Sequence, residues 1–192
     1  MGAGLILASA SPRRRELLAR LGIAFRVVPS EAAETPHPGE APLAFANRMA
    51  REKAGSVARR HSEAFVLGAD TIVVVDEEIL GKPVDRADAR RMLQRLSDRT
   101  HQVFTAVALI DMAGRVDQLA IETSVDFRRL ADTEIDAYLD SGEPFDKAGA
   151  YAVQGGAAPF VRRIGGSYTN VVGLPLDEVA VLLRRRMPWL HD

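Results

Sequence analysis

Hydrophobic positions along the chain form short apolar runs that alternate with segments of helical period. Residues 5–8 are continuously apolar and predict a short buried strand. The helix that follows has Ser11 as its expected N-cap, Pro12 at its first position and Gly22 as its stop. Further strands are expected at 25–28, 65–67, 71–75, 79–80, 102–110, 118–127 and 151–154, and further helices at 43–60, 86–96, 133–139 and 175–186. This alternation predicts one α/β domain, residues 1–192, with a mixed sheet flanked by helices.

Composition narrows the classes of function. The 192 residues carry a net charge of −1, so bulk charge does not direct the chain to nucleic acid. The absence of Cys excludes disulfides, thiol nucleophiles and Cys-ligated zinc, and it fits a cytoplasmic location. No apolar run approaches the length of a membrane span. We therefore expect neither a nucleic-acid nor a membrane partner.

Three arginines occupy an unusual place at the start of the first predicted helix. A helix N-terminus carries partial positive charge, so cations are disfavoured there by roughly 0.3–1 kcal/mol each. A bound phosphate would relieve that conflict, because helix N–H groups, hydroxyls and guanidinium groups all bind phosphate oxygens. Residues 9–15, Ser-Ala-Ser-Pro-Arg-Arg-Arg, therefore suggest an anion site, with a solvated basic turn as an equally weighted alternative.

An acid interrupts the apolar residues between 65 and 75. Asp70 lies in Gly68-Ala69-Asp70-Thr71, between two runs that predict buried strand. A buried carboxylate needs a partner or a cleft, and at such a place it would hold a divalent cation or accept a proton from water. On local sequence alone, a turn in which Asp70 bonds to its own backbone is the somewhat favoured alternative.

Two further glycine-containing segments are candidates for ligand contact. Lys82 lies in Gly81-Lys82-Pro83, where a surface hairpin turn is the commoner explanation. Gln154 lies in the run of glycine, charged and aromatic residues 142–156, and its amide suits a base edge. The alternative for this run is a long surface loop with a structural Gln. The chain has no P-loop sequence and no dinucleotide-binding glycine fingerprint.

Taken together, these segments resemble the Maf family of nucleoside triphosphate pyrophosphatases. The matching stretches, in order, are 7–18, 50–54, 68–73, 80–83 and the run 142–156 with 166–175. The resemblance implies an elongated fold with two lobes around a deep cleft, related to the inosine-triphosphate pyrophosphatases. It also implies cleavage between the α and β phosphates of a nucleoside triphosphate, with a divalent cation such as Mg²⁺, Mn²⁺ or Co²⁺.

The resemblance also implies roles for individual residues. Asp70 is the expected proton acceptor, Glu34 a second catalytic carboxylate, and both are expected metal ligands; which of these tasks Asp70 performs stays open. The expected phosphate-binding residues are Ser9, Arg13, Arg14, Lys53 and Lys82, the last also counted as catalytic. The family commonly has Asp-Glu before Thr-Pro, whereas this chain has Ala33-Glu34, which leaves Glu31 as a candidate replacement ligand.

Three residues bear on specificity. Arg13, Thr71 and Gln154 match the branch of the family that acts on dTTP and UTP, and a Gln amide offers the donor and acceptor that a uracil or thymine edge requires. The resemblance thus predicts a dTTP/UTP pyrophosphatase that clears surplus or modified pyrimidine nucleotides. The alternatives are an enzyme for 7-methyl-GTP or inosine-type triphosphates, and a non-catalytic nucleotide-sensing regulator of septum formation. Expected partners are small-molecule nucleoside triphosphates, and the sequence is compatible with a homodimer.

Overall fold

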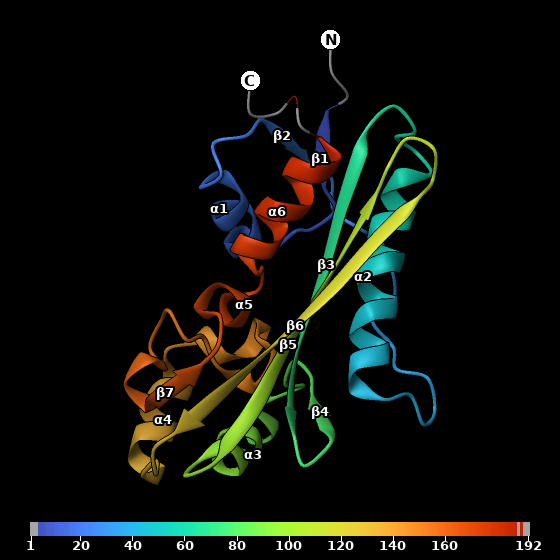
Figure 1. Cartoon of the computed structure of the whole chain (residues 1–192). Helices are drawn as coiled ribbons and strands as arrows, with labels where there is room; N and C mark the ends of the chain where they lie inside the picture. The colour runs from blue at the N-terminus through green and yellow to red at the C-terminus, as the bar shows by residue number, and fades with distance from the viewer. Residues whose placement is uncertain (1–3, 188, 190–192) are drawn as a thin grey trace. The chain divides into compact units, whose positions relative to one another are not determined.

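A seven-stranded mixed sheet flanked by helices organises the computed structural model, which describes residues 4–187 and residue 189 (Figure 1). The strands are β1 (Leu5–Leu7), β2 (Phe25–Val27), β3 (Phe65–Val75), β4 (Glu78–Leu80), β5 (Thr100–Ile110), β6 (Val116–Phe127) and β7 (Val161–Gly165). Their order is β2-β1-β3-β5-β6-β7, with β4 paired to β3. β1 is parallel to β2 and β3, whereas the β3–β4 and β6–β7 pairs are antiparallel. The α/β prediction with a mixed sheet is therefore confirmed.

The helices largely follow the predicted ranges. They are α1 (Pro12–Ala19), α2 (Pro42–Ala58), α3 (Arg86–Leu96), α4 (Asp132–Asp140), α5 (Tyr168–Val172) and α6 (Leu176–Arg186), with short 3-10 helices η1 (Glu143–Asp146), η2 (Ala148–Ala150) and η3 (Ala158–Phe160). The sequence reasoning did not anticipate α5. Within the described part of the chain, every helix is too short or too polar to cross a membrane.

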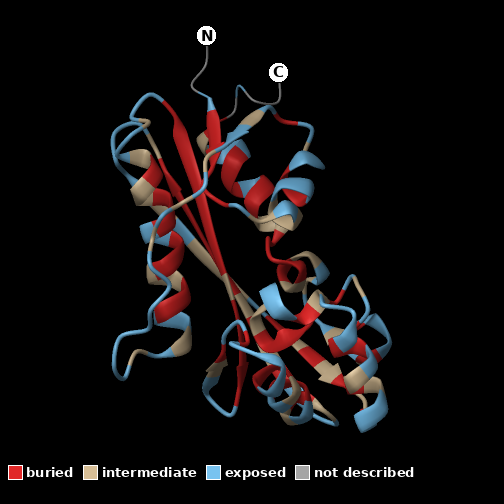
Figure 2. Cartoon of the chain, turned by 180° about the vertical axis from the view of Figure 1, so that it is seen from behind, coloured by how far each residue is buried: buried red, intermediate tan, exposed pale blue. Residues whose placement is uncertain are grey.

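The chain comprises two compact units. Unit 1 consists of residues 1–70, 105–121 and 173–192, and unit 2 consists of residues 71–104 and 122–172. In unit 1, Figures 1 and 2 place α2 on one side of the strands and α1 and α6 on the other. The residues of β1 are buried between them, as the apolar run 5–8 predicts (Figure 2). In unit 2, α3 and α4 pack together, and Arg90 on α3 pairs with Asp132 on α4 at 3.0 Å.

Local signals in the sequence determine both ends of α1. Ser11 has an extended backbone, and its hydroxyl accepts a hydrogen bond from the Arg14 N–H at 3.4 Å. Pro12 occupies the first turn, where its missing N–H costs nothing. The helix ends at Ala19, and Gly22 follows with φ +71°, a conformation that favours glycine. The predicted N-cap and proline positions are confirmed.

Residues 65–75 form one continuous strand, so the predicted interruption at 68–70 is wrong. Gly68 does not break β3, because its role is to let α2 approach. A Cβ atom at Gly68 would lie 2.5 Å from the Ala50 carbonyl oxygen and 2.6 Å from the Ala54 nitrogen. The strand accommodates Asp70 because the carboxylate has a buried partner on α2, described below. Glycine in this strand therefore marks a close contact between backbones and not a turn.

The expected strand at 151–154 is also wrong. The Ala152 carbonyl accepts a hydrogen bond from the Gly155 N–H at 3.0 Å, which closes a turn around Val153 and Gln154. Gly155 and Gly156 follow directly, and paired glycines favour a turn over an extended strand. The result is that Gln154 occupies the third position of a tight turn, with its side chain exposed.

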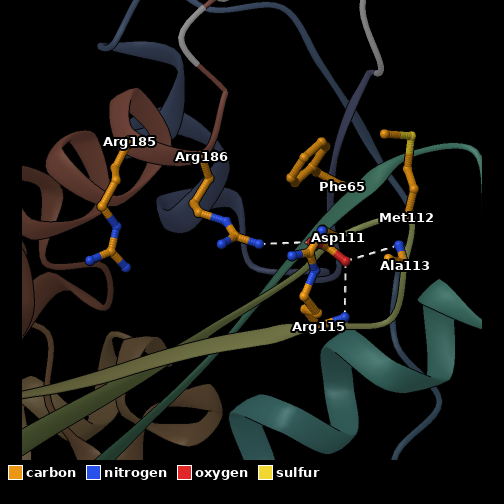
Figure 3. Close-up of a pocket in the computed structure, with 7 residues that line it drawn as sticks. All are labelled: Phe65, Asp111, Met112, Ala113, Arg115, Arg185 and Arg186. Atoms are coloured by element: carbon orange, nitrogen blue, oxygen red, sulfur yellow. Dashed lines mark hydrogen bonds and ion pairs between the residues drawn. The ribbon is translucent and has the colours of Figure 1, made fainter.

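Ion pairs connect the last turn of α6 to Asp111, at the turn between β5 and β6, and to Asp117 on β6; Figure 3 shows the contacts of Asp111. Arg186 contacts Asp111 at 2.7 Å and Asp117 at 3.1 Å, and Arg185 contacts Asp117 at 3.0 Å. Asp111, the two arginines and Phe65 help to line a pocket of about 460 Å³. None of the predicted site residues lines this pocket, and Asp111 in its wall is paired with both Arg115 and Arg186.

Candidate active site

Lys53 connects two carboxylates in unit 1. Its Nζ atom lies 2.6 Å from Asp70 Oδ1 and 2.7 Å from Glu34 Oε1. Lys53 and Asp70 are only 7% and 6% exposed, whereas half of the Glu34 side chain is exposed. Charged groups are this deeply buried only when opposite charges compensate them. Three of the predicted site residues therefore meet at one place, with Glu34 on the solvent side.

Helix and strand periodicity explain why these side chains meet. Asp70 lies two residues after Gly68, so both positions face the same side of β3. Gly68 faces Ala50 and Ala54 of α2. Lys53 lies on the same buried face of that helix, because positions three and four apart on a helix share a face. The close contact at Gly68 thus places a lysine opposite an aspartate.

Ser9 and the first turn of α1 follow the carboxyl end of β1. β1 and β3 are parallel, with Leu7 paired to Leu67, so the chain leaves β1 at the level of the middle of β3, where Asp70 lies. The Ser9 hydroxyl accepts hydrogen bonds from the Ser11 N–H at 3.2 Å and from Arg14 Nη1 at 3.5 Å. Ligands of open α/β sheets bind beyond the carboxyl ends of the strands.

Arg14 shares the electrostatic environment of the carboxylates. Its Nε donates a hydrogen bond to the Gly173 carbonyl at 2.9 Å, which joins α1 to the segment before α6. Burial lowers the pKa of the Arg14 guanidinium, and Arg13 lowers it further, while the charges of Asp70 and Glu34 act to raise it. The guanidinium stays protonated, because an arginine pKa remains far above neutral. Arg13, Arg14 and Lys53 exceed the two carboxylates by one positive charge, which suits a polyanion.

Asp70 and Glu34 are the donors that this cluster offers to a divalent cation. Each places a carboxylate oxygen within 2.7 Å of the same nitrogen atom of Lys53. Among the described residues, no three His, Asp or Glu side chains converge as a complete metal site. Two carboxylates nevertheless fit Mg²⁺, which proteins commonly hold by one or two carboxylates together with substrate phosphates. Glu31, the candidate replacement ligand, is 80% exposed at its side chain and contacts Arg60 at 3.4 Å.

Unit 2 carries the remaining predicted residues, Thr71, Lys82 and Gln154. Gly149 contacts the chain segments that carry these three residues. Its N–H donates a hydrogen bond to the Gly81 carbonyl at 3.0 Å, and its φ of +68° favours glycine. A Cβ atom there would lie 3.0 Å from the Val73 side chain. The Lys82 loop, the strand that carries Thr71 and the segment leading to Gln154 are therefore neighbours within unit 2.

Comparison with known proteins decides the family. A model for Maf-like proteins matches residues 4–186. The chain belongs to the Maf family. A protein of Myxococcus xanthus (strain DK1622) named dTTP/UTP pyrophosphatase is 54% identical over 189 residues, covering 96% of this chain and 95% of the relative. A Geobacter sulfurreducens protein of the same name is 56% identical over 184 residues, covering 94% and 95%.

Solved structures support the same fold for this Maf-family chain. The nucleoside-triphosphatase/dITP/XTP pyrophosphatase of Mycobacterium abscessus has a TM-score of 0.51 at 20% identity and covers 97% of this chain and 96% of its own. A HAM1 protein from Coxiella burnetii has a TM-score of 0.52 at 18% identity, with 95% and 99% covered. At this identity the likeness establishes the fold, and it confirms the expected relation to the inosine-triphosphate pyrophosphatase architecture.

In unit 2 of the Maf-family chain, a buried pair that the motif reasoning did not identify lies at the start of the segment that leads to Gln154. His101 Nε2 and the Tyr151 hydroxyl lie 2.8 Å apart, and the His101 ring packs edge-on against Phe127. Burial lowers the pKa of His101 to about 4 and raises that of the Tyr151 hydroxyl. His101 is therefore neutral near pH 7 and anchors the segment that leads to Gln154. The aromatic residue at position 151 was the only sign of this pair in the motif, because its partner, His101, is 50 residues away in sequence.

Proposed function

We propose that this chain hydrolyses dTTP and UTP to the nucleoside monophosphate and pyrophosphate. The observation that carries the proposal is the contact of Lys53 with both Asp70 and Glu34, whose charges also act on Arg14 beside Ser9. The name that two relatives of more than 50% identity share, dTTP/UTP pyrophosphatase, supports the choice of substrates. The absence of Cys is in keeping with a cytoplasmic location.

Charge neutralisation is the first requirement of this reaction. The phosphates of the substrate repel a nucleophile, and pyrophosphate leaves poorly while its charge is unbalanced, so catalysis depends on positioning and electrostatics. We assign Arg13, Arg14, Lys53 and Lys82 to the β and γ phosphates, with the Ser9 hydroxyl as a further contact. Guanidinium groups suit this task because they bind phosphate oxygens in pairs.

Asp70 is the assigned proton acceptor. The oxygen of water bonds to the α-phosphorus, the bond from that phosphorus to the bridging oxygen breaks, and pyrophosphate leaves with the bond electrons. The proton of the water passes to Asp70; because Lys53 contacts Oδ1, we assign the proton to Oδ2. Maf-family enzymes depend on a divalent metal in general, and Glu34 would hold the cation, because the two oxygens of Asp70 are assigned to Lys53 and to the proton. When bound, the cation would neutralise phosphate charge.

Base recognition is assigned to the turn in unit 2 and to Arg13 and Thr71. Gln154 is exposed in that turn, and its amide provides one donor group and one acceptor, which match the carbonyl and N–H of a uracil or thymine edge. Cytosine presents an amino group in place of one carbonyl, and purines require a longer site. This pattern favours dTTP and UTP over the other nucleotides.

A substrate panel tests the proposal. Purified protein is incubated with dTTP, UTP, CTP, GTP, ITP and 7-methyl-GTP in the presence of Mg²⁺, Mn²⁺ or Co²⁺, and pyrophosphate and monophosphate are quantified. Release of both products from dTTP and UTP, with the ¹⁸O of labelled water in the monophosphate, is the expected result. Label in the pyrophosphate would place the attack at the β-phosphorus. Absence of hydrolysis of dTTP and UTP with all three cations would overturn the proposal.

A further inference from the structure

The turn that presents Gln154 is held at both ends by side chains with no role in the proposed chemistry. At its start, the Ala152 N–H donates a hydrogen bond to the Tyr138 hydroxyl at 3.0 Å. At its end, the Gly156 N–H donates to Glu143 Oε2 at 2.9 Å. Between these contacts, the Ala152 carbonyl and the Gly155 N–H close the turn itself. The backbone on each side of Gln154 is therefore tied to η1 or α4.

The fit between Glu143 and the turn is closer than the hydrogen bond alone requires. A Cβ atom on Gly155 would lie 1.9 Å from Glu143 Oε1, so the carboxylate occupies the space that a side chain would fill. A Cβ atom on Gly156 would lie 3.0 Å from the ring of Tyr138. The pair of glycines therefore lets a carboxylate and an aromatic ring reach the backbone directly. Tyr138 is itself fixed, because it is 5% exposed and packs edge-on against Phe160.

We propose that Glu143 is a positioning residue for substrate selection, which acts through the Gly155–Gly156 backbone to fix the direction of the Gln154 amide. Tyr138 supports it from the other end of the turn. The inference rests on the proposed function, since it assumes that Gln154 reads the base. A hydrogen bond to a base edge distinguishes one base from another only when its donor and acceptor are held in place. A loosened turn should therefore lose selectivity between nucleotides before the protein loses phosphate binding.

The test compares selectivity and not activity alone. For each variant, kcat/KM is measured with UTP and with CTP, and their ratio is the readout. Glu143→Ala is expected to lower the ratio about tenfold or more, because the Gly156 N–H loses its charged acceptor. Glu143→Gln keeps an acceptor oxygen and should retain the ratio within about threefold. Asp140→Ala, which removes an exposed carboxylate at the end of α4, is the matched control and should leave the ratio unchanged.

Two further variants address the same contact independently. Gly155→Ala would displace the Glu143 carboxylate, so the double variant Glu143→Ala/Gly155→Ala should be no less selective than Gly155→Ala alone. Tyr138→Phe keeps the ring but removes the acceptor of the Ala152 N–H, and it provides the test if Glu143→Ala does not fold. Amide hydrogen exchange at Gly156 should become faster in Glu143→Ala and stay slow in Glu143→Gln.

The outcomes separate the two proposals. A wild-type protein that releases no pyrophosphate from UTP contradicts the proposed function. An active wild type whose UTP/CTP ratio does not change in Glu143→Ala or Tyr138→Phe overturns the positioning role and leaves the activity intact. An equal loss of kcat/KM with both nucleotides, accompanied by a lower midpoint of thermal unfolding, would show a purely structural role and also overturns it.

Discussion

Lys53 Nζ lies 2.6 Å from Asp70 Oδ1, and both side chains are more than nine-tenths buried. Removing one partner of a buried ion pair leaves the other charge uncompensated. We expect Lys53→Met to destabilise the protein by about 3–5 kcal/mol in urea unfolding, since two carboxylates would then remain without their shared cation. The double variant Lys53→Met/Asp70→Leu should recover part of that loss while staying inactive. Additive losses in the double variant would show that the two side chains are not energetically coupled.

Asp70→Asn separates the chemistry from the fold. The amide keeps the volume of the side chain, and Glu34 still neutralises Lys53, so the variant should fold. We expect kcat with dTTP to fall by about 10²–10⁴-fold, because an amide does not accept the proton of water. Asp140→Asn is the control and should retain wild-type turnover. Near-wild-type turnover by folded Asp70→Asn would remove Asp70 from the role of proton acceptor.

The arginines of α1 should differ sharply although they are adjacent in sequence. Arg14 reaches Ser9 and Gly173, whereas Arg15 is exposed. Arg14→Ala should lower kcat/KM for UTP by about 10–100-fold, in line with the loss of charge-assisted hydrogen bonds to phosphate. Arg15→Ala should stay within about twofold of the wild type. The steady-state rates of the two variants provide the measurement, and equal effects would argue against a specific phosphate contact.

Two glycine-to-alanine substitutions in unit 1 should have opposite effects on stability. Gly68→Ala would place a Cβ atom against the backbone of α2, so we expect a loss of about 1–3 kcal/mol or more. Gly55 lies inside α2, where a Cβ atom would meet its nearest neighbour at 3.8 Å. Gly55→Ala should therefore raise the free energy of unfolding by about 0.5–1 kcal/mol. Urea unfolding of both variants decides the point, and a stable Gly68→Ala would contradict the close packing.

Stability should fall in acid because of His101. Its pKa is lowered from 6.5 to about 4 by burial, so below pH 6.5 the unfolded chain binds a proton that the folded chain does not. The free energy of unfolding should therefore decrease by about 1.4 kcal/mol per pH unit between pH 6.5 and 4, and this contribution should level off below pH 4. In the His101→Gln variant, the free energy of unfolding should lack this decrease between pH 6.5 and 4. Parallel pH profiles for the wild type and the variant would show that His101 does not titrate in this way.

Local patterns in the sequence sufficed for much of the fold. The Ser11 cap, the Pro12 start and the apolar faces of the helices depend on neighbours in sequence, and the predicted elements largely appear. The errors at 68–70 and 151–154 have a different origin. Gly68 and Asp70 suggested a break because their partners, Ala50, Ala54 and Lys53, lie on another element.

In the candidate site too, contacts between elements that are distant in sequence could not be predicted. Ordered motifs identified residues of unit 1 that the fold does bring together, such as Lys53, Glu34 and Asp70. The roles of Glu143 and Tyr138 were not predicted, because an ordinary acid and an ordinary aromatic residue become informative only when their distances to the turn are known. Motif recognition finds groups that touch a ligand more readily than groups that hold those groups in place.

The register in which β3 pairs with β1 determines on which side of the sheet the Asp70 carboxylate lies. Alternate residues of a strand face opposite sides, so inserting or deleting one residue between Phe65 and Ala69 would turn the Asp70 carboxylate away from Lys53. The apolar residues that flank this stretch would still form a buried strand. Such an indel would remove the proton acceptor from the site and, because Lys53 would lose its buried partner and Gly68 its place against α2, it would lower the stability of the fold at the same time.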